Sequence, residues 1–201
     1  PEAIIGDGVL LDNTILMIIG QKKARKSFFA LNLSMAIASG LDFAGFKIEK
    51  KSKVLHLSLE GGYFPNRSRI RKMSQAIELD SMKNINFVKK VNISIENEED
   101  FEFLRGCIIK SECEVLVLDP LAKLHLQDEN SSNSMALVFK KIRELMDEFG
   151  LSVIIIHHSG KNAGLGGRGS SFIGGEYDSA ITITKKAADT SLGFEFRHVE
   201  T

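Results

Sequence analysis

The stretch GQKKARKS, residues 20–27, has the spacing of a phosphate-binding loop. Such loops follow the pattern G-x-x-x-x-G-K-[ST], in which the lysine reaches the β and γ phosphates and the hydroxyl binds Mg²⁺. Lys26 and Ser27 stand at these two positions, and the remaining predicted ATP-binding residues are Gly20, Gln21, Lys22, Lys23, Ala24, Arg25 and Phe28. The stretch predicts binding of ATP with Mg²⁺. A basic strand-to-helix turn without a ligand is the alternative.

Arg25 stands where the usual loop has its second glycine. Glycine supplies freedom of φ and room near the phosphates, so a larger residue must direct its side chain out of the phosphate cradle. Lys22, Lys23 and Arg25 also add positive charge, which favours an anionic ligand over an inactive copy of the loop. We therefore expect the loop to bind nucleotide.

Two acidic residues follow apolar stretches. VLVLDP contains Asp119, in the pattern of a Walker B carboxylate that holds Mg²⁺ through water; a buried acid is unfavourable without a partner, and a metal would be one. VLHLSLEGG contains Glu60, which could orient and polarise an attacking water. For Glu60, a helix-capping or turn role is the alternative. We predict Ser27 and Asp119 as the Mg²⁺ site and Glu60 as a catalytic residue.

A histidine pair ends the apolar run LSVIIIHH. Side chains alternate along a strand, so one of His157 and His158 should face the site and the other a face of the sheet. A neutral imidazole can donate one hydrogen bond to a γ phosphate. Histidine pairs also bind metals, but no third ligand with suitable spacing accompanies this pair. We predict a phosphate sensor rather than a zinc site.

The elements that must position these residues alternate along the chain. Short, β-branched and nearly continuous apolar runs predict buried strands over 14–20, 53–59, 114–120 and 151–158. Between or beside them, helical patterns span 26–39, roughly 65–79, roughly 97–111 and 133–149. This alternation predicts an α/β fold with a mostly parallel, doubly wound central sheet flanked by helices. Ligands of such sheets bind at the carboxyl ends of the strands, where the polar residues above are found.

The alternation of apolar runs and helical patterns ends after His158. The glycine-rich segment SGKNAGLGGRGSS leads to SAITITKK and LGFEFRH, which predict two further strands, antiparallel at the C-terminal edge of the sheet. There is no internal repeat or low-complexity linker, so residues 1–201 are expected to form a single domain. The chain begins at proline rather than methionine, as would a domain excised from a longer chain.

The composition narrows the choice of partners. Lysine and arginine total 26, equal to aspartate and glutamate, so any nucleic-acid site must be a local patch. Cys107 and Cys113 lack a metal-ligand pattern, which favours reduced thiols in a cytoplasmic protein. No apolar stretch approaches the roughly 18 to 20 residues needed to cross a bilayer, so no membrane role is expected.

Five motifs in order, GQKKARKSFFALNLSMAIASG, HLSLEGG, VLVLDPLAKLH, VIIIHHSGK and GRGSS, resemble those of the AAA-family ATPases of plasmids, phages and integrated elements. That group includes the hexameric replicative helicase RepA. The resemblance covers essentially the whole chain. It implies a RecA-like fold, a P-loop with Lys26 and Ser27, a catalytic Glu60, a Walker B Asp119 and a sensor in the histidine pair. It also implies that the chain forms a homo-oligomeric ring, a hexamer as in RepA, and that the ring binds single-stranded DNA. Members of the group carry lysine or arginine in the P-loop, so Arg25 resembles a variant of that family.

This chain lacks one active-site residue of the RepA-type helicases that it resembles. They complete each active site with an arginine from the neighbouring subunit, and the aligned position here lies near Asp178, where there is no arginine. Either Arg168, Lys185 or Lys186 takes that role, or the contact is lost. Because such an arginine contributes on the order of 10³ to 10⁵ in rate, its loss predicts a slow ATPase.

The glycine-rich segment corresponds to the channel loop that contacts DNA in RecA-like rings. Lys161 and Arg168 can pair with phosphates, and Ser170 and Ser171 can donate hydrogen bonds to them. A solvated surface loop is the alternative. Two functions remain: an ATP-hydrolysing motor on single-stranded DNA in replication or recombination of a mobile element, or an ATP-dependent switch or loader module with slow hydrolysis and no unwinding.

Overall fold

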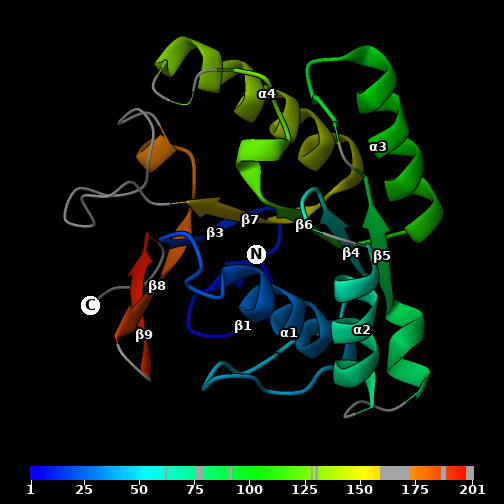
Figure 1. The fold of residues 1–201 in the computed structure, drawn as a ribbon, viewed down its shortest axis with the longest axis vertical. Helices are drawn as coiled ribbons and strands as arrows, with labels where there is room; N and C mark the ends of the chain where they lie inside the picture. Colours follow the sequence, from blue (N-terminus) through cyan, green and yellow to red (C-terminus); the bar gives the residue numbers. More distant parts are fainter. Residues whose placement is uncertain are drawn as a thin grey trace.

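A seven-stranded sheet forms the centre of the structure, a computed structural model that describes residues 1–61, 63–75, 79–90, 92–127, 129, 131–158, 173–186 and 189–197. Its spatial order is β5-β4-β6-β7-β3-β8-β9 (Figure 1). The strands are β3 (Ile15–Gly20), β4 (Val54–Ser58), β5 (Ile85–Lys89), β6 (Val115–Asp119), β7 (Ser152–His158), β8 (Ser179–Lys186) and β9 (Asp189–Phe196). Neighbouring strands are parallel except β8 and β9, which are antiparallel.

Helices cover both faces of this sheet. The helices are α1 (Lys26–Ser39), α2 (Tyr63–Ser74), α3 (Glu98–Ser111) and α4 (Ser132–Phe149). Figure 1 shows α3 and α4 on one face, and α1 with α2 beside it on the other. Within the described ranges, no helix combines the length and the apolar character that crossing a membrane requires.

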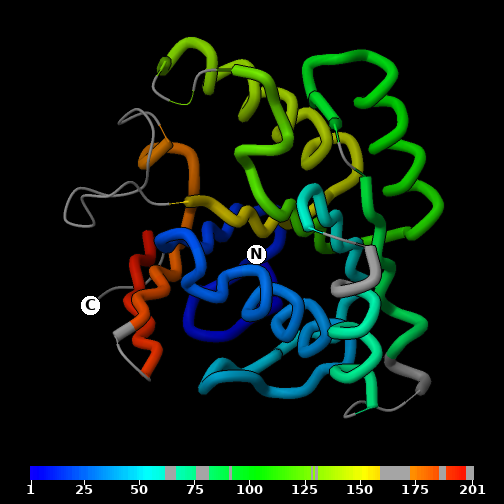
Figure 2. Tube along the Cα trace, viewed as in Figure 1, coloured from blue at the N-terminus to red at the C-terminus, as the bar shows by residue number. Residues whose placement is uncertain are grey.

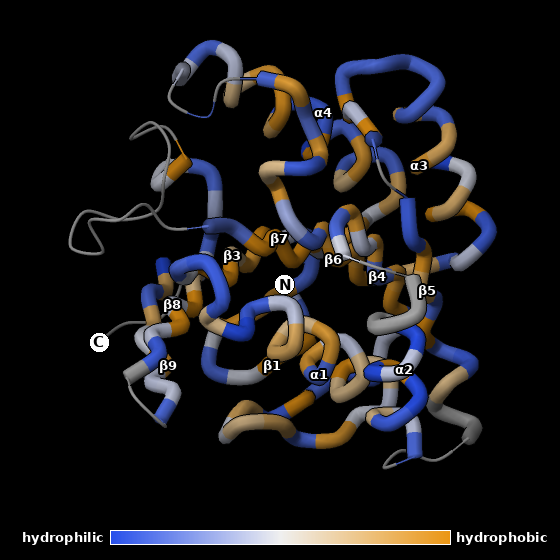
Figure 3. Tube along the Cα trace, viewed as in Figure 1, coloured by the Kyte–Doolittle hydropathy of each residue, from blue (hydrophilic) through white to orange (hydrophobic). Residues whose placement is uncertain are grey.

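Continuous apolar sequence explains why the middle strands lie between two helical layers. Every residue of β3 and β6 is buried, and Figure 3 shows the sheet as a largely hydrophobic band. Because side chains alternate along a strand, each strand contributes side chains to two hydrophobic cores, one on each face of the sheet. Met17 and Leu118 belong to the core under α3 and α4, whereas Ile18 and Val117 belong to the core that packs against α1.

The predicted parallel α/β fold is confirmed, with its four main strands and four helices close to the predicted bounds. The helix predicted over roughly 65–79 begins at Tyr63 and ends at Ser74. β5 was not predicted, because INFVK is short and only its first residue is buried, so it lacks the continuous apolar run of the inner strands. The hairpin of β1 (Ala3–Ile5) and β2 (Leu10–Leu11) was also missed.

The antiparallel pair predicted at the C-terminal edge is confirmed, and β8 also joins the sheet as a parallel neighbour of β3. In the tube of Figure 2 the blue strand β3 therefore lies between segments of the last third of the chain, yellow β7 and orange β8. Gly20 pairs with His158 on one side and with Ile183 on the other. The P-loop thus leaves the sheet from its interior.

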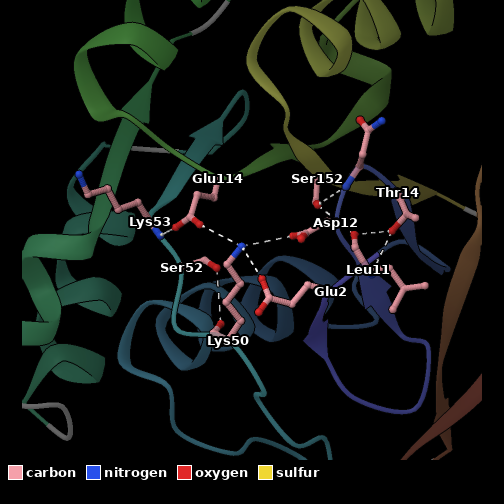
Figure 4. Close-up of polar contacts among 10 residues, drawn as sticks. Glu2, Leu11, Asp12, Thr14, Lys50, Ser52, Lys53, Glu114 and Ser152 are labelled. Carbon is pink, nitrogen blue, oxygen red and sulfur yellow. Dashed lines mark hydrogen bonds and ion pairs between the residues drawn. The ribbon is translucent and has the colours of Figure 1, made fainter.

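An ion-pair cluster ties the N-terminal segment to the end of the sheet opposite the P-loop (Figure 4). Lys50 Nζ lies within 3.3 to 3.4 Å of carboxylate oxygens of Glu2, Asp12 and Glu114. Burial lowers the pKa of Lys50, but the hydrogen bonds that Lys50 donates to Glu114 and Glu2, together with the charge of Asp12, raise the pKa overall. Because Glu114 directly precedes β6, this cluster anchors the amino ends of the strands and leaves their carboxyl ends to the site.

Candidate nucleotide-binding site

Gly20 closes β3 at a point where the chain has no room for a side chain. A Cβ atom at this position would lie 2.6 Å from the backbone oxygen of Ile183 on β8. After Gly20 the chain turns, with the backbone N–H of Ala24 donating to the carbonyl of Gln21 at 3.1 Å, and α1 begins at Lys26. Strand, turn and helix therefore direct the helix N-terminus toward one point, the arrangement that favours anions.

Two residues of this turn adopt a backbone conformation that glycine usually takes. Lys23 has φ 66° and Arg25 has φ 64°, both in the left-handed region. For a residue with a Cβ this conformation costs roughly 1–2 kcal/mol. Both side chains are exposed and line the pocket described below. The loop thus keeps the glycine-type backbone at Arg25 and adds two cations to the pocket wall.

Lys26 is held against the loop by its own backbone. Its side chain is 4% exposed, and Nζ donates to the carbonyls of Gly20 and Gln21, at 2.8 Å each. Burial lowers the pKa of Lys26 to about 8, and the charges of Asp119 and Glu60 partly oppose that shift. The ammonium is therefore already directed into the turn where phosphates would lie.

Ser27 and Asp119 meet across the strand-to-helix junction. Ser27 Oγ donates to Oδ1 of Asp119 at 3.0 Å, and Asp119 is 5% exposed at the carboxyl end of β6. A hydroxyl and a carboxylate form an all-oxygen donor set, which suits a hard cation such as Mg²⁺. The two residues fit the metal that the P-loop pattern implies.

Glu60 lies two residues beyond β4, in a turn fixed by a neighbouring strand. Lys89, the last residue of β5, donates to the carbonyl of Glu60 at 3.2 Å and also to that of Gly61. Gly61 has φ 82°, which only glycine adopts without strain. The Glu60 side chain is exposed and lines the pocket. The sequence did not single out Lys89, because its role depends on the pairing of β4 with β5.

The two histidines lie on opposite faces of β7. His158 lines the pocket beside Lys26, whereas His157 is 0% exposed and follows Val153 and Ile155, which belong to the core under α3 and α4. Burial lowers the pKa of His158, and the positive charges of Lys26 and Lys22 lower it further against the opposing effect of Glu60. A neutral imidazole at the pocket is therefore favoured.

A pocket of about 550 Å³ lies at this end of the sheet. Among the described residues it is lined by residues 23–28 together with Glu60, Arg69 and His158. Arg69, an exposed residue of α2, was not singled out from the sequence, where it belongs to the basic run NRSRIRKM. A helix with several basic residues does not reveal which one turns toward a ligand, so only the placement of α2 identifies Arg69.

The predicted DNA-binding residues Lys161, Arg168, Ser170 and Ser171 lie outside the described residues, so their role stays a prediction. Asp178 lies at the other end of the sheet, where its carboxylate accepts from the backbone N–H of Ile15 at 2.8 Å. This position, aligned with the missing arginine, thus carries a bond that joins β3 to the start of β8.

Comparisons with known proteins agree with this architecture. A family model, AAA_25, described as an AAA domain, matches residues 1–164. The crystal structure of a KaiC-like protein from the hyperthermophilic archaeon Pyrococcus horikoshii OT3 matches with a TM-score of 0.62 and 16% identity, covering 96% of this chain and 82% of that one. At this identity the match shows the fold alone, and the fold is RecA-like. With its family model covering most of its length, the chain belongs to the AAA domain family.

Proposed function

We propose that the protein binds Mg-ATP in the pocket at the carboxyl ends of β3, β4 and β7 and hydrolyses it there. The observation that carries this proposal is the meeting of Lys26, Glu60 and His158 around one pocket, with the Ser27–Asp119 pair at its edge. The pocket's volume, about 550 Å³, lies in the range of small-molecule sites. The membership of the AAA domain family supports a nucleotide as the ligand.

Each residue has a task that its position supports. Lys26 neutralises the β and γ phosphates, and the first turn of α1 offers them backbone N–H groups. Ser27 and Asp119 hold Mg²⁺, which when bound would neutralise charge on the phosphate oxygens. Glu60 orients the attacking water and accepts its proton, and His158 donates a hydrogen bond to the γ phosphate.

Arg69 extends this set with a cation that comes from the same chain. An arginine can bind phosphate oxygens through two parallel hydrogen bonds, and it keeps its charge at any pH near neutrality. We assign it to the triphosphate end of the pocket, because it shares the pocket lining with the P-loop and Glu60. Its contribution would compensate in part for the absence of an arginine at Asp178.

For the wider role, we propose that the ATPase acts on single-stranded DNA in replication or recombination of a mobile element, as a homo-oligomeric ring. The motif order that resembles RepA-type helicases supports it. The alternative is an ATP-dependent switch or loader with slow hydrolysis. It is favoured by Asp178, which stands near the position of the trans arginine and instead accepts a hydrogen bond from Ile15. The deciding experiment measures ATP hydrolysis with and without single-stranded DNA, alongside the solution mass with nucleotide. Stimulation and a ring support the motor, and their joint absence supports the switch.

A further inference from the structure

A row of buried polar side chains lies beneath Asp119, inside the apolar layer between the sheet and α1. His56, in the middle of β4, and Ser34, on α1, are both 0% exposed. His56 Nδ1 lies 2.9 Å from Ser34 Oγ, and His56 Nε2 lies 3.9 Å from Oδ2 of Asp119. The residues around them, such as Ile18 and Val117, are apolar. Polar groups in such a layer are unfavourable unless they are partnered.

The sheet register explains how the row forms. His56 pairs with Val117 and Ser58 with Asp119, so His56 and Asp119 lie on the same face, two positions apart on neighbouring strands. Ser27 and Ser34 lie two helical turns apart on α1 and therefore on one side of that helix. The row runs from Ser27 through Asp119 and His56 to Ser34.

Ser34 determines how the imidazole can be oriented. Its hydroxyl lies within hydrogen-bonding distance of His56 Nδ1 and also 2.7 Å from the carbonyl of Ala30. A neutral ring attracts the carboxylate only when its proton is on Nε2, and this requires the Ser34 hydroxyl to donate to Nδ1. With the hydroxyl donating to Ala30, Nε2 would present a lone pair to the carboxylate, so the nearby Asp119 favours the first arrangement. Among the described residues, Nε2 has no hydrogen-bond partner. At 3.9 Å the interaction with Oδ2 is longer than a hydrogen bond and acts on the carboxylate electrostatically.

We infer that His56, held by Ser34, is a positioning residue for Asp119. Ser27 binds one carboxylate oxygen and His56 faces the other, so the carboxylate has a defined orientation. The role rests on the proposed function, in which Asp119 holds Mg²⁺. Residues that orient a metal ligand without touching the metal affect metal affinity strongly, and mutating them typically lowers that affinity 10–100-fold.

The test measures metal dependence of nucleotide binding rather than turnover. Binding of the non-hydrolysable analogue AMP-PNP is followed by calorimetry at increasing Mg²⁺ concentrations. In His56→Leu the Mg²⁺ concentration for half-maximal tight binding should rise by about 10-fold, while metal-free binding of AMP-PNP is unchanged. Ser34→Ala should cause a smaller rise, roughly threefold, the equivalent of one hydrogen bond. Ser39→Ala is the matched control, because Ser39 also bonds back to its own helix, at Met35, but does not reach His56.

Two conservative changes separate positioning from packing. A glutamine amide can reach the place of Nε2, whereas an asparagine amide stops near Nδ1. His56→Gln should therefore restore much of the Mg²⁺ affinity lost in His56→Leu, and His56→Asn should not. Equal losses in all three His56 variants would indicate a packing role and overturn the inference, as would an unchanged Mg²⁺ dependence.

Thermal unfolding of each variant is measured first. If His56→Leu does not fold, Ser34→Ala decides the question, because it removes only a hydroxyl: an unchanged Mg²⁺ requirement would overturn the inference. The parent protein separates this inference from the proposed function. If the parent binds AMP-PNP without any Mg²⁺ dependence, the assignment of Asp119 itself fails. If the parent depends on Mg²⁺ and the variants match it, only the role of His56 fails.

Discussion

Ser27 and Asp119 are 92 positions apart in the sequence, yet Ser27 Oγ donates a 3.0 Å hydrogen bond to Oδ1 of Asp119. The first residue lies in the opening turn of α1 and the second at the end of β6. Because β7 separates β3 from β6 in the sheet, the contact depends on α1 crossing above that strand. This pair defines where a metal ion would meet the phosphates.

Lys26→Ala should weaken ATP binding by roughly 100-fold, equivalent to about 2.8 kcal/mol, because it removes a charge-assisted contact to the phosphates. Calorimetry with Mg-ATP measures the affinity. Lys22→Ala is the comparison: Lys22 belongs to the predicted loop, but it is exposed and is not among the residues that line the pocket, so its loss should have a smaller effect. A Lys26→Ala protein that binds ATP as tightly as the parent would rule out the P-loop assignment.

Replacing the two carboxylates should have different effects on binding and turnover. Glu60→Gln should retain ATP binding and reduce turnover by roughly 10² to 10⁴, because an amide neither accepts the proton nor polarises water strongly. Asp119→Asn should instead raise the Mg²⁺ concentration needed for binding. Steady-state turnover and Mg²⁺ titration are measured on both variants. Mild and equal effects would mean that neither carboxylate lies at the phosphates.

Arg69→Ala should weaken binding of ATP more than binding of ADP, because we place Arg69 at the triphosphate end of the pocket. The loss expected for a charged contact is about 2 kcal/mol, roughly 30-fold in affinity. Arg67→Ala and Arg71→Ala provide matched controls: both are exposed on α2 and neither lines the pocket. If all three variants lose affinity equally, α2 acts only through its general positive charge.

Arg25→Gly should stabilise the fold and weaken nucleotide binding. Glycine adopts φ 64° without the roughly 1–2 kcal/mol penalty of a side chain, although its greater freedom in the unfolded chain offsets part of the gain. We expect a net gain of about 0.5 kcal/mol in the free energy of unfolding by urea. Loss of the Arg25 charge should lower ATP affinity in the same protein. A destabilised Arg25→Gly protein would show that the arginine side chain has a structural contact.

His158 should take up protons when nucleotide binds. In the ligand-free protein burial and the charge of Lys26 lower its pKa, and phosphates would neutralise that charge and raise it. The complex then binds more protons than the free protein, so ATP affinity gains as pH falls through the interval between the two pKa values. Calorimetry in buffers of different ionisation enthalpy, below the ordinary histidine pKa of about 6.5, measures the uptake. His158→Gln corrects for protons bound by ATP itself. Equal uptake in both proteins would exclude His158 from the phosphates.

Local pattern was sufficient for the main elements and for the residues that one segment carries. The run GQKKARKS predicted the loop, and the apolar runs before Gly20 and Asp119 predicted strands that are fully buried. The side-chain period of a strand also predicted that His157 and His158 would face different environments. Such features depend on neighbours in sequence, so they can be recognised without the fold.

Tertiary structure decided which distant residues meet. Pairing of β4 with β5 brings Lys89 to the carbonyls around Glu60, and the placement of α2 selects Arg69 from a run of similar cations. His56 looks like one polar residue in an apolar strand until β6 and α1 place Asp119 and Ser34 on either side of it. The sequence by itself determined the P-loop, the four inner strands and their polar ends. Which side chains share the site depended on strand order and helix packing, because those contacts join residues far apart in the chain and have no local sequence pattern.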